Sequence, residues 1–478
     1  MRALLKAQAD VNAPQADGAM ALTWAVHWDE LEMAEILLQA GAKVNTANRN
    51  GITPLALACQ NGSARMIEKL LRSGADPKQS PPTGETPLMT AASTGSVDAV
   101  RSLLEHGAEV NARETLGGQS ALMWAVAEKH SEVARFLIQH GADVHAKSKS
   151  GFTPLLFAAQ QGDIATARIL LEAGAQVDEA SAAAPSNRGA FTAAGYMRVI
   201  ESRGEMTPLL LATISGQEEM AIFLTENGAN PNASDANGSV IHYAVRKGIV
   251  YINRQDSNGM GDSPTARQPN MLRLVKTLLA RGADPSARMK RNPESGSLVS
   301  PVGATPLLLA AASSDAALVR LLLESGANPG IATEKNTTAL MLAAGVGRSE
   351  DRLPLDDTGA LEVVRILVEH GAQVGMANQD DTQTALHGAA RIGANAIIQY
   401  LVERGAKLDV MDSMGQTPLS LASGVITKNS YNVSKSPFGP HPSTMALLRN
   451  LGAKSLDESG VQVMDVVKDS ATPLVISK

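Results

Sequence analysis

A Gly-Ala pair recurs along this chain at a nearly constant spacing, and this recurrence constrains the fold more than any other feature. The first four intervals between successive pairs are 33, 33, 34 and 33 residues. A chain of 478 residues is too long for one ordinary core, so a fixed period indicates a row of similar units. The pairs begin at Gly41, Gly74, Gly107, Gly141, Gly174, Gly228, Gly282, Gly326, Gly371, Gly405 and Gly452.

A Thr-Pro-Leu block follows the pair at a fixed offset and marks the start of a helix. In one copy, Thr153 can cap a helix whose first residue is Pro154, where the missing amide hydrogen is not needed. Gly162 then ends this helix, and apolar residues recur at helical spacing from Ile164 until Gly174. Each copy therefore predicts two helices, here called helix A and helix B. The block begins at Thr53, Thr86, Thr153, Thr207, Thr305 and Thr417, with looser copies at Ser120, Thr338 and Thr384.

The composition favours thin, regular layers. Apolar residues make up 44% of the chain but aromatic residues only 3%, so Ala, Leu, Val and Ile must fill the interior. The net charge of −6 is mild for this length, which excludes a polycation for nucleic acid. The single cysteine, Cys59, excludes an intrachain disulfide framework and occupies an Ala position, where we expect core packing.

These blocks and this period resemble the ankyrin repeat. The resemblance covers nearly the whole chain and implies an all-α solenoid of stacked helix-turn-helix pairs with hairpin loops and several inserts. We expect the array over 1–454, in about eleven copies plus an N-terminal partial copy. Residues 455–478 are expected to form a C-terminal tail or a partial repeat. The first twelve residues read as the second half of a repeat, which leaves open an upstream cap or export signal.

Long intervals between copies locate the inserts, which are rich in Gly, Ser, Pro and Asn. Residues 179–204 and 288–302 extend hairpins, whereas 249–269, 345–360 and 424–441 separate helix A from helix B. This pattern of inserts resembles a group of bacterial ankyrin arrays. No apolar run approaches the roughly 20 residues that span a bilayer, so we expect a soluble chain in an undetermined compartment.

Histidines invite a metal interpretation that the repeat makes unnecessary. His106, His140 and His370 each precede a Gly-Ala pair, and equivalent positions of stacked helices lie about 8–10 Å apart, too far to share one zinc ion. They are expected to bond at helix C-termini. His242 and His387 lie at the histidine position of the Thr-Pro-Leu-His block, where the resemblance implies that the ring bonds neighbouring loops.

Catalytic motifs are absent from the sequence. The chain has no HExxH, GxxxxGK[ST] or GxSxG motif. We therefore expect neither an enzyme nor a cofactor or metal site, although an enzyme built on the inserts remains an alternative, as does a structural spacer.

The three tryptophans have different predicted roles. Trp24 and Trp124 occupy the same apolar position of helix A, as Phe157 does in a third copy, so both are expected in the core. Trp28 stands just before the end of helix A, where ankyrin repeats expose variable residues. Two roles remain open for Trp28: a binding anchor of the kind that interfaces favour, or a cover for the N-terminal edge of the array.

The resemblance implies a concave binding surface made of helix A ends and hairpins, and hence a protein partner. The variable positions, transferred one copy at a time, share no common chemistry, as a surface specialised for one partner would. They are Trp28, Gln60, Asn61, Ser93, Thr94, Gln160, Gln161, Arg246, Lys247, Arg391 and Ile392.

One segment departs from the mild charge of the chain. Residues 246–291 contain ten Lys and Arg against three Asp, a net charge of +7. Arg246 and Lys247 lead into the longest insert between two helices, so an acidic protein surface is expected to dock there. Nucleic acid is not expected, because no aromatic-basic platform lines the array, and the chain is expected to be a monomer.

Overall fold

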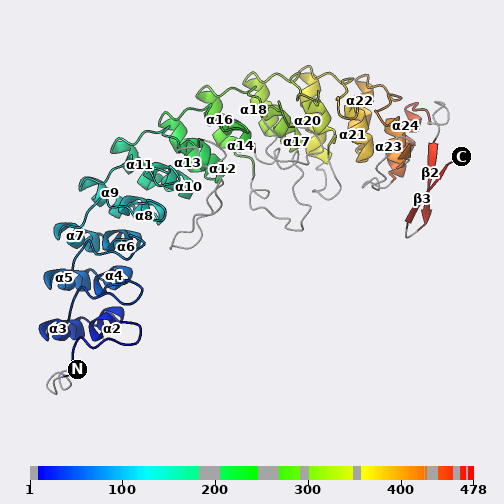
Figure 1. Ribbon diagram of the computed structural model, residues 1–478. Helices are drawn as coiled ribbons and strands as arrows, with labels where there is room; N and C mark the ends of the chain where they lie inside the picture. The colour runs from blue at the N-terminus through cyan, green and yellow to red at the C-terminus, as the bar shows by residue number, and fades with distance from the viewer. Residues whose placement is uncertain are drawn as a thin grey trace. The chain divides into compact units, whose positions relative to one another are not determined.

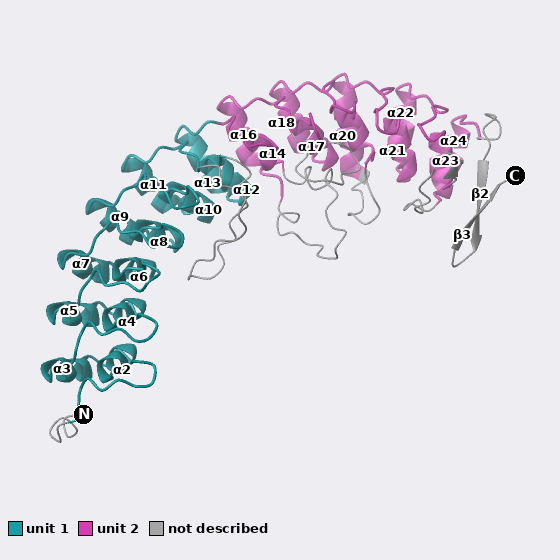
Figure 2. Cartoon of the chain, in the orientation of Figure 1, with its two compact units in different colours: residues 1–230 teal, residues 231–478 magenta. Residues whose placement is uncertain are grey.

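The computed structural model divides into two compact units, residues 1–230 and residues 231–478 (Figure 2). Both units consist of short antiparallel helix pairs stacked in sequence order (Figure 1). The all-α array that the sequence predicts is therefore confirmed. The structure describes residues 9–181, 205–245, 269–290, 301–347, 357–424, 426–427, 440–455, 463–469 and 472–477.

Unit 1 contains six pairs within its described residues, each made of helix A followed by helix B. The pairs are α2 (Ala21–His27) with α3 (Leu31–Gln39), α4 (Pro54–Gln60) with α5 (Ala64–Arg72), α6 (Pro87–Ser93) with α7 (Val97–Glu105), α8 (Ala121–Ala127) with α9 (Ser131–Gln139), α10 (Pro154–Gln161) with α11 (Ile164–Glu172), and α12 (Pro208–Ile214) with α13 (Glu218–Glu226).

Unit 2 contains five pairs within its described residues. They are α14 (Val240–Ala244) with α16 (Leu272–Ala280), α17 (Pro306–Ala312) with α18 (Ala316–Glu324), α19 (Ala339–Ala343) with α20 (Asp357–Glu369), α21 (Ala385–Arg391) with α22 (Asn395–Glu403), and α23 (Pro418–Ser423) with α24 (Pro442–Asn450).

Helix ends follow the local chemistry that the sequence predicts. The hydroxyl of Thr153 accepts a hydrogen bond from the Leu156 amide, and Pro154 is the first residue of α10. Gly162 ends α10 in the left-handed conformation, with φ of 72°. The long gaps between helix A and helix B fall in the predicted copies, since α14, α19 and α23 each end well before the next helix B begins. The predicted insert 345–360 is shorter than expected, because α20 already begins at Asp357.

Small residues allow close packing between successive copies of helix A. In unit 1, α4 packs on α6 and α6 packs on α8. Ala58, Ala91 and Ala125 of these helices are fully buried, as is Cys59, which confirms its place in the core. Around them lie leucines such as Leu88, and full burial of one such side chain contributes roughly 1.5–3 kcal/mol.

Asparagine side chains connect one hairpin to the next repeat. The Asn45 amide Nδ2 donates to the Gly74 carbonyl at 2.9 Å, while its Oδ1 accepts from the Asp76 amide at 2.8 Å. Asn111 makes the same pair of bonds to Gly141 and Asp143. An Asn stands four residues after the Gly-Ala pairs at Gly41, Gly107 and Gly228. In these copies the segment that ends one helix B also sets the spacing to the next repeat.

The C-terminal segment adds strands to unit 2 that the sequence did not predict. Strands β1 (Ile426–Thr427), β2 (Val463–Asp469) and β3 (Thr472–Ser477) form an antiparallel sheet in the order β1-β2-β3. Val466 of β2 pairs with Val475 of β3. Residues 463–477 therefore contain strands where a tail or a partial repeat was expected.

Candidate functional site

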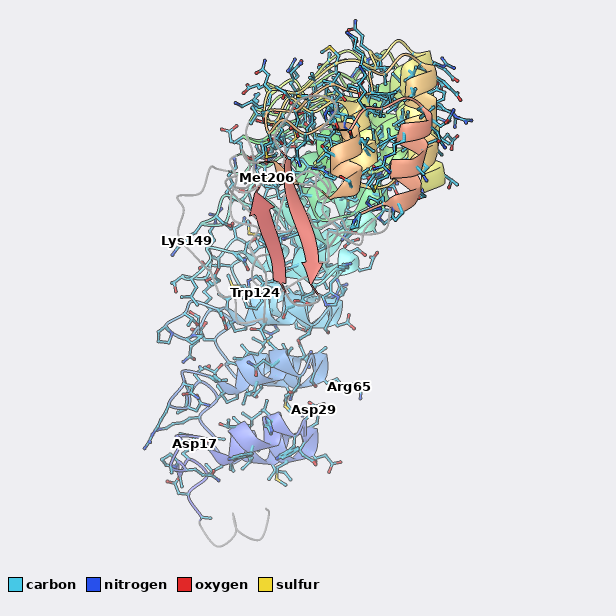
Figure 3. The ribbon with its side chains drawn as sticks, turned by 90° about the vertical axis from the view of Figure 1, so that its right-hand side faces the viewer. Asp17, Asp29, Arg65, Trp124, Lys149 and Met206 are labelled. Atoms are coloured by element: carbon cyan, nitrogen blue, oxygen red, sulfur yellow. The ribbon has the colours of Figure 1, made fainter. Side chains whose placement is uncertain are left out.

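The turns that close each helix A lie along one edge of unit 1, at the opposite end of the helices from the hairpins. Figure 3 shows this separation: Asp17 and Lys149 mark the hairpin edge, and Asp29 and Arg65 mark the other edge. We call the surface that runs over helix A between these edges the groove face. The outer face is the exposed side of helix B.

Two tryptophans and a histidine form an exposed aromatic cluster at the first helix A of the groove face. Trp28 caps the C-terminus of α2 and is 69% exposed, while Trp24, one turn earlier, is 40% exposed. The His27 ring stands edge-on to both indoles, at 5.7 Å from Trp24 and 4.9 Å from Trp28 between ring centroids. Trp24 Nε1 also donates to Gln15 of the preceding hairpin at 3.1 Å. These contacts hold the rings in place while leaving much of their surface open.

The prediction that Trp24 is a core residue is wrong, and the hairpin residue five positions earlier explains why. In the fifth repeat of unit 1, Phe152 packs on Phe157 at 5.5 Å between ring centroids, and Phe157 is buried. The equivalent of Phe152 in the first repeat is Ala19, which has no side chain long enough to cover Trp24. Trp124, labelled in Figure 3, is half-buried and lies between these two extremes.

The next predicted pair, Gln60 and Asn61, is exposed beside the aromatic cluster. Asn61 Nδ2 donates to the carbonyls of Val26 and His27 at 2.9 and 3.2 Å. The Asn61 amide thus closes the end of α2, and this bond joins the Trp28 turn to the second repeat. Gln60, the last residue of α4, is exposed at the same edge.

The remaining predicted positions of unit 1 are also linked to the neighbouring repeat through their backbone. The Ser93 carbonyl contacts His130 Nε2 at 2.9 Å, and the Gln160 carbonyl accepts from Gln217 Nε2 at 3.4 Å. Thr94 is exposed, whereas Gln161 is half-buried. The structure therefore places all these residues along one edge, where some side chains are exposed and others are half-buried.

Arg391 and Ile392 of unit 2 are half-buried and contact the turn that follows α19. Arg391 Nη2 donates to the Gly345 carbonyl at 3.0 Å, and burial lowers the pKa of the guanidinium. Ile392 Cδ1 lies 2.5 Å from the place that a Cβ at residue 345 would occupy. These side chains secure the end of α19. Arg246 and Lys247 lie outside the described residues.

Leu116 is an exposed apolar residue that was not among the binding residues predicted from the sequence. Leu116 is 59% exposed in the hairpin before α8, which is one residue longer than the hairpins of the second and fifth repeats. The Glu114 carboxylate holds this hairpin by accepting from the amides of Gly117 and Gln119 at 2.8 Å. Its position between Thr115 and Gly117 in an otherwise polar hairpin could have indicated an exposed apolar residue.

Family models for ankyrin repeats match most of the chain. The model of three repeat copies matches residues 1–81, 55–148, 114–181, 265–351 and 356–433, and the single-repeat model matches residues 204–236. This chain belongs to the ankyrin-repeat family. Ankyrin repeats are generally protein–protein interaction modules, and proteins of this family are typically non-enzymatic.

The ankyrin chain also has a curated relative. It is 33% identical over 183 residues to the nuclear factor NF-kappa-B p105 subunit of Gallus gallus. The match covers 34% of this chain and 18% of that protein, so the chain spans less than a fifth of the length of its relative.

The five histidines to which the sequence assigned structural roles each contact a backbone carbonyl. His106, His140 and His370 each place ring Nδ1 against the carbonyl four residues earlier, at 2.7–2.8 Å. His242 Nε2 contacts the carbonyls of Ala287 and Ala304, and His387 Nε2 contacts that of Gln416. In the described parts of the chain, no three His, Cys, Asp or Glu residues are placed to hold a metal ion. The described helices also include none long and apolar enough to cross a membrane.

Proposed function

We propose that this ankyrin chain is a non-catalytic scaffold that binds a partner protein through the groove face of unit 1, with Trp28 and Trp24 as anchors. The observation that carries the proposal is the aromatic cluster, in which two large rings are held at the surface by neighbours in the same repeat. Tryptophan is the residue type most enriched among binding hot spots.

The exposed tryptophan surface is costly in the free protein. A Trp side chain buries about 200 Å² when covered, so covering the open part of Trp28 would yield about 3 kcal/mol. Flanking residues Gln60 and Asn61 supply polar groups at the rim of such an interface, and Leu116 supplies a second apolar contact from the hairpin edge. A structural spacer would have no use for such a surface.

A binding role also agrees with the places of three described groups whose pKa values are strongly shifted. Burial raises the pKa of the Cys59 thiol and lowers the pKa of the His242 and His387 rings, but each of these groups lies in the core or bonds a loop. The named relative is itself a subunit of a larger assembly, which supports a scaffold role by likeness.

The experiment compares proteins captured by the wild-type chain with those captured by a Trp24→Ala, Trp28→Ala double variant. Partners of the groove face should drop at least tenfold in the variant, because two anchors of about 1.4 kcal/mol or more are lost. Glu105→Ala, an exposed change on the outer face at the end of α7, is the matched control and should capture the same proteins as wild type. Equal capture by all three chains, each with wild-type circular dichroism, would contradict the proposal.

A second part of the proposal concerns the basic segment of residues 246–291. An acidic surface of the partner docks at Arg246 and Lys247, and this part rests on the sequence alone.

A further inference from the structure

The aromatic cluster lies in the most acidic part of unit 1. Residues 9–42 contain six Asp and Glu and no Lys or Arg, whereas residues 9–181 as a whole contain 20 acidic and 13 basic residues. The basic residues that precede this stretch, Arg2 and Lys6, lie outside the described residues. The surface around Trp24 and Trp28 therefore carries a negative potential that favours a cationic ligand.

Two of these carboxylates directly follow Trp28. Asp29 and Glu30 are exposed, and within the described residues no Lys or Arg forms an ion pair with either. By contrast, Glu35 on the outer face is paired with Lys69 at 2.7 Å. Asp29 also adopts φ of 53° at the position where the second, third and fifth repeats carry Gly62, Gly95 and Gly162.

The aromatic rings of the outer face are used differently. Arg101 lies 4.5 Å above the Phe136 ring and Arg168 lies 5.0 Å from the Phe223 ring, so each pairs a cation with the ring of the next repeat. No such cation covers Trp24 or Trp28 among the described residues, although the indole face attracts cations most strongly of all side chains. The groove face thus presents ring faces and carboxylates, and among the described residues no cation is stacked on the two indoles.

We propose that the aromatic cluster, together with Asp29 and Glu30, receives a basic segment of the partner protein, in which an Arg or Lys stands beside an apolar side chain. The apolar side chain covers the indoles while the cation stacks on an indole face and pairs with the two carboxylates. This inference rests on the proposed function and specifies the chemistry of its partner.

Phage-displayed twelve-residue peptides selected on the full chain test this inference directly. Selected peptides should be enriched in Arg and Lys next to apolar residues and depleted in Asp and Glu. The best basic peptide, labelled for fluorescence polarisation, should bind Trp28→Ala at least tenfold more weakly, and Trp28→Phe within about threefold of wild type, because the ring face is retained. Asp29→Lys with Glu30→Lys should also weaken binding tenfold or more at low salt.

The matched charge control is Glu105→Lys with Glu172→Lys, which makes the same change on the outer face, and it should bind as wild type does. Neutral or acidic selected peptides that still depend on Trp28 would overturn this inference and leave the proposed function standing. Peptides whose binding ignores every groove-face variant would overturn both. If the chain self-associates through Trp28, the site binds a second copy of this chain. That result would also overturn the proposal of a basic partner segment.

Discussion

At the residue scale, the exposure of a tryptophan in helix A depends on one neighbouring hairpin residue. Trp24 and Trp124 occupy equivalent positions of helix A, yet Trp24 is the more exposed, because the hairpin residue that could cover it is Ala19 and not a larger side chain. Exposure in a repeat protein is therefore set by pairs of positions that pack across a turn.

The buried Cys59 provides a chemical probe of the first repeats. Its thiol is fully buried and burial raises its pKa, so the reactive thiolate is scarce in the folded chain. We expect Ellman's reagent to label Cys59 only as fast as the surrounding repeats open, and immediately in denaturant. The added thiol of an exposed Thr94→Cys variant should react within seconds, and equal rates for both thiols would disprove the burial of Cys59.

A non-glycine residue with left-handed backbone angles offers a site where substitution by glycine should stabilise the fold. Lys129 adopts φ of 62° in the turn after α8, where other repeats carry glycine. Lys129→Gly should raise the free energy of unfolding by up to about 1 kcal/mol, because the steric strain of a Cβ is removed. The opposite change, Gly162→Ala, should lower it by about 1–2 kcal/mol, since its φ is 72° and the Gln217 side chain would have to move away from the new Cβ. Urea titration measures both, and a destabilised Lys129→Gly chain would show that this turn is not strained.

At the scale of the element, the third residue of helix A decides how each repeat responds to acid. In α14, His242 accepts the Ser239 amide at Nδ1 and donates from Nε2 to the Ala287 and Ala304 carbonyls, which requires a neutral ring. Burial lowers the pKa of His242 to about 4, although Asp284 and Asp235 partly oppose this shift. The pKa of His387 in α21 is lowered for the same reason, with Asp412 opposing it and Arg391 adding to it.

Acid should therefore destabilise unit 2 selectively. Between pH 6.5 and 4 the unfolded chain binds a proton at His242 that the folded chain does not. The free energy of unfolding therefore decreases as the pH is lowered through this range, by about 3 kcal/mol for this ring. The equivalent positions of unit 1 include Ala56, Met89 and Leu156, which do not titrate. All three tryptophans lie in unit 1, so in mild urea circular dichroism should change at a higher pH than tryptophan fluorescence does.

The double variant His242→Met, His387→Met controls this prediction, because Met89 and Met123 occupy the same position in other repeats. It should flatten the pH dependence between 6.5 and 4, whereas His106→Gln on the outer face should leave it unchanged. A chain whose circular dichroism and fluorescence transitions coincide at every pH would contradict the assignment of acid sensitivity to unit 2.

At the scale of the whole molecule, charge is separated along the sequence. Residues 9–42 are acidic and residues 246–291 carry a net charge of +7 within a chain of net charge −6. Such polarity affects association rates more than affinity. A partner that carries both a basic segment and an acidic surface would match the two regions.

Reversal of charge in the basic segment tests that region independently. Arg246→Glu with Lys247→Glu should slow association with the captured partner several-fold and flatten its dependence on salt, because long-range attraction is removed. Stopped-flow or surface-based kinetics at two salt concentrations measures this. Unchanged association by a folded double variant would remove these two residues from the binding surface.

Local chemistry made most of the fold readable from the sequence alone. The Gly-Ala and Thr-Pro-Leu blocks predicted the helix pairs, since caps such as Thr153 and Gly162 act within one turn of their own helix. The structural role of His106 was local to its own helix, whereas His242 contacts the distant carbonyls of Ala287 and Ala304. For Trp28 the sequence left two roles open, a binding anchor or a cover for the N-terminal edge, and its side chain is 69% exposed.

Features that depend on a second repeat or a distant segment required the tertiary structure. Arg391 donates to the Gly345 carbonyl 46 residues away, and β1 pairs with β2 across more than 30 residues of chain. The energies of such contacts depend on which side chains meet, and a period in the sequence does not specify that. The repeat motif thus determined where the helices lie, and packing between neighbours decided which of their residues remain available to a partner.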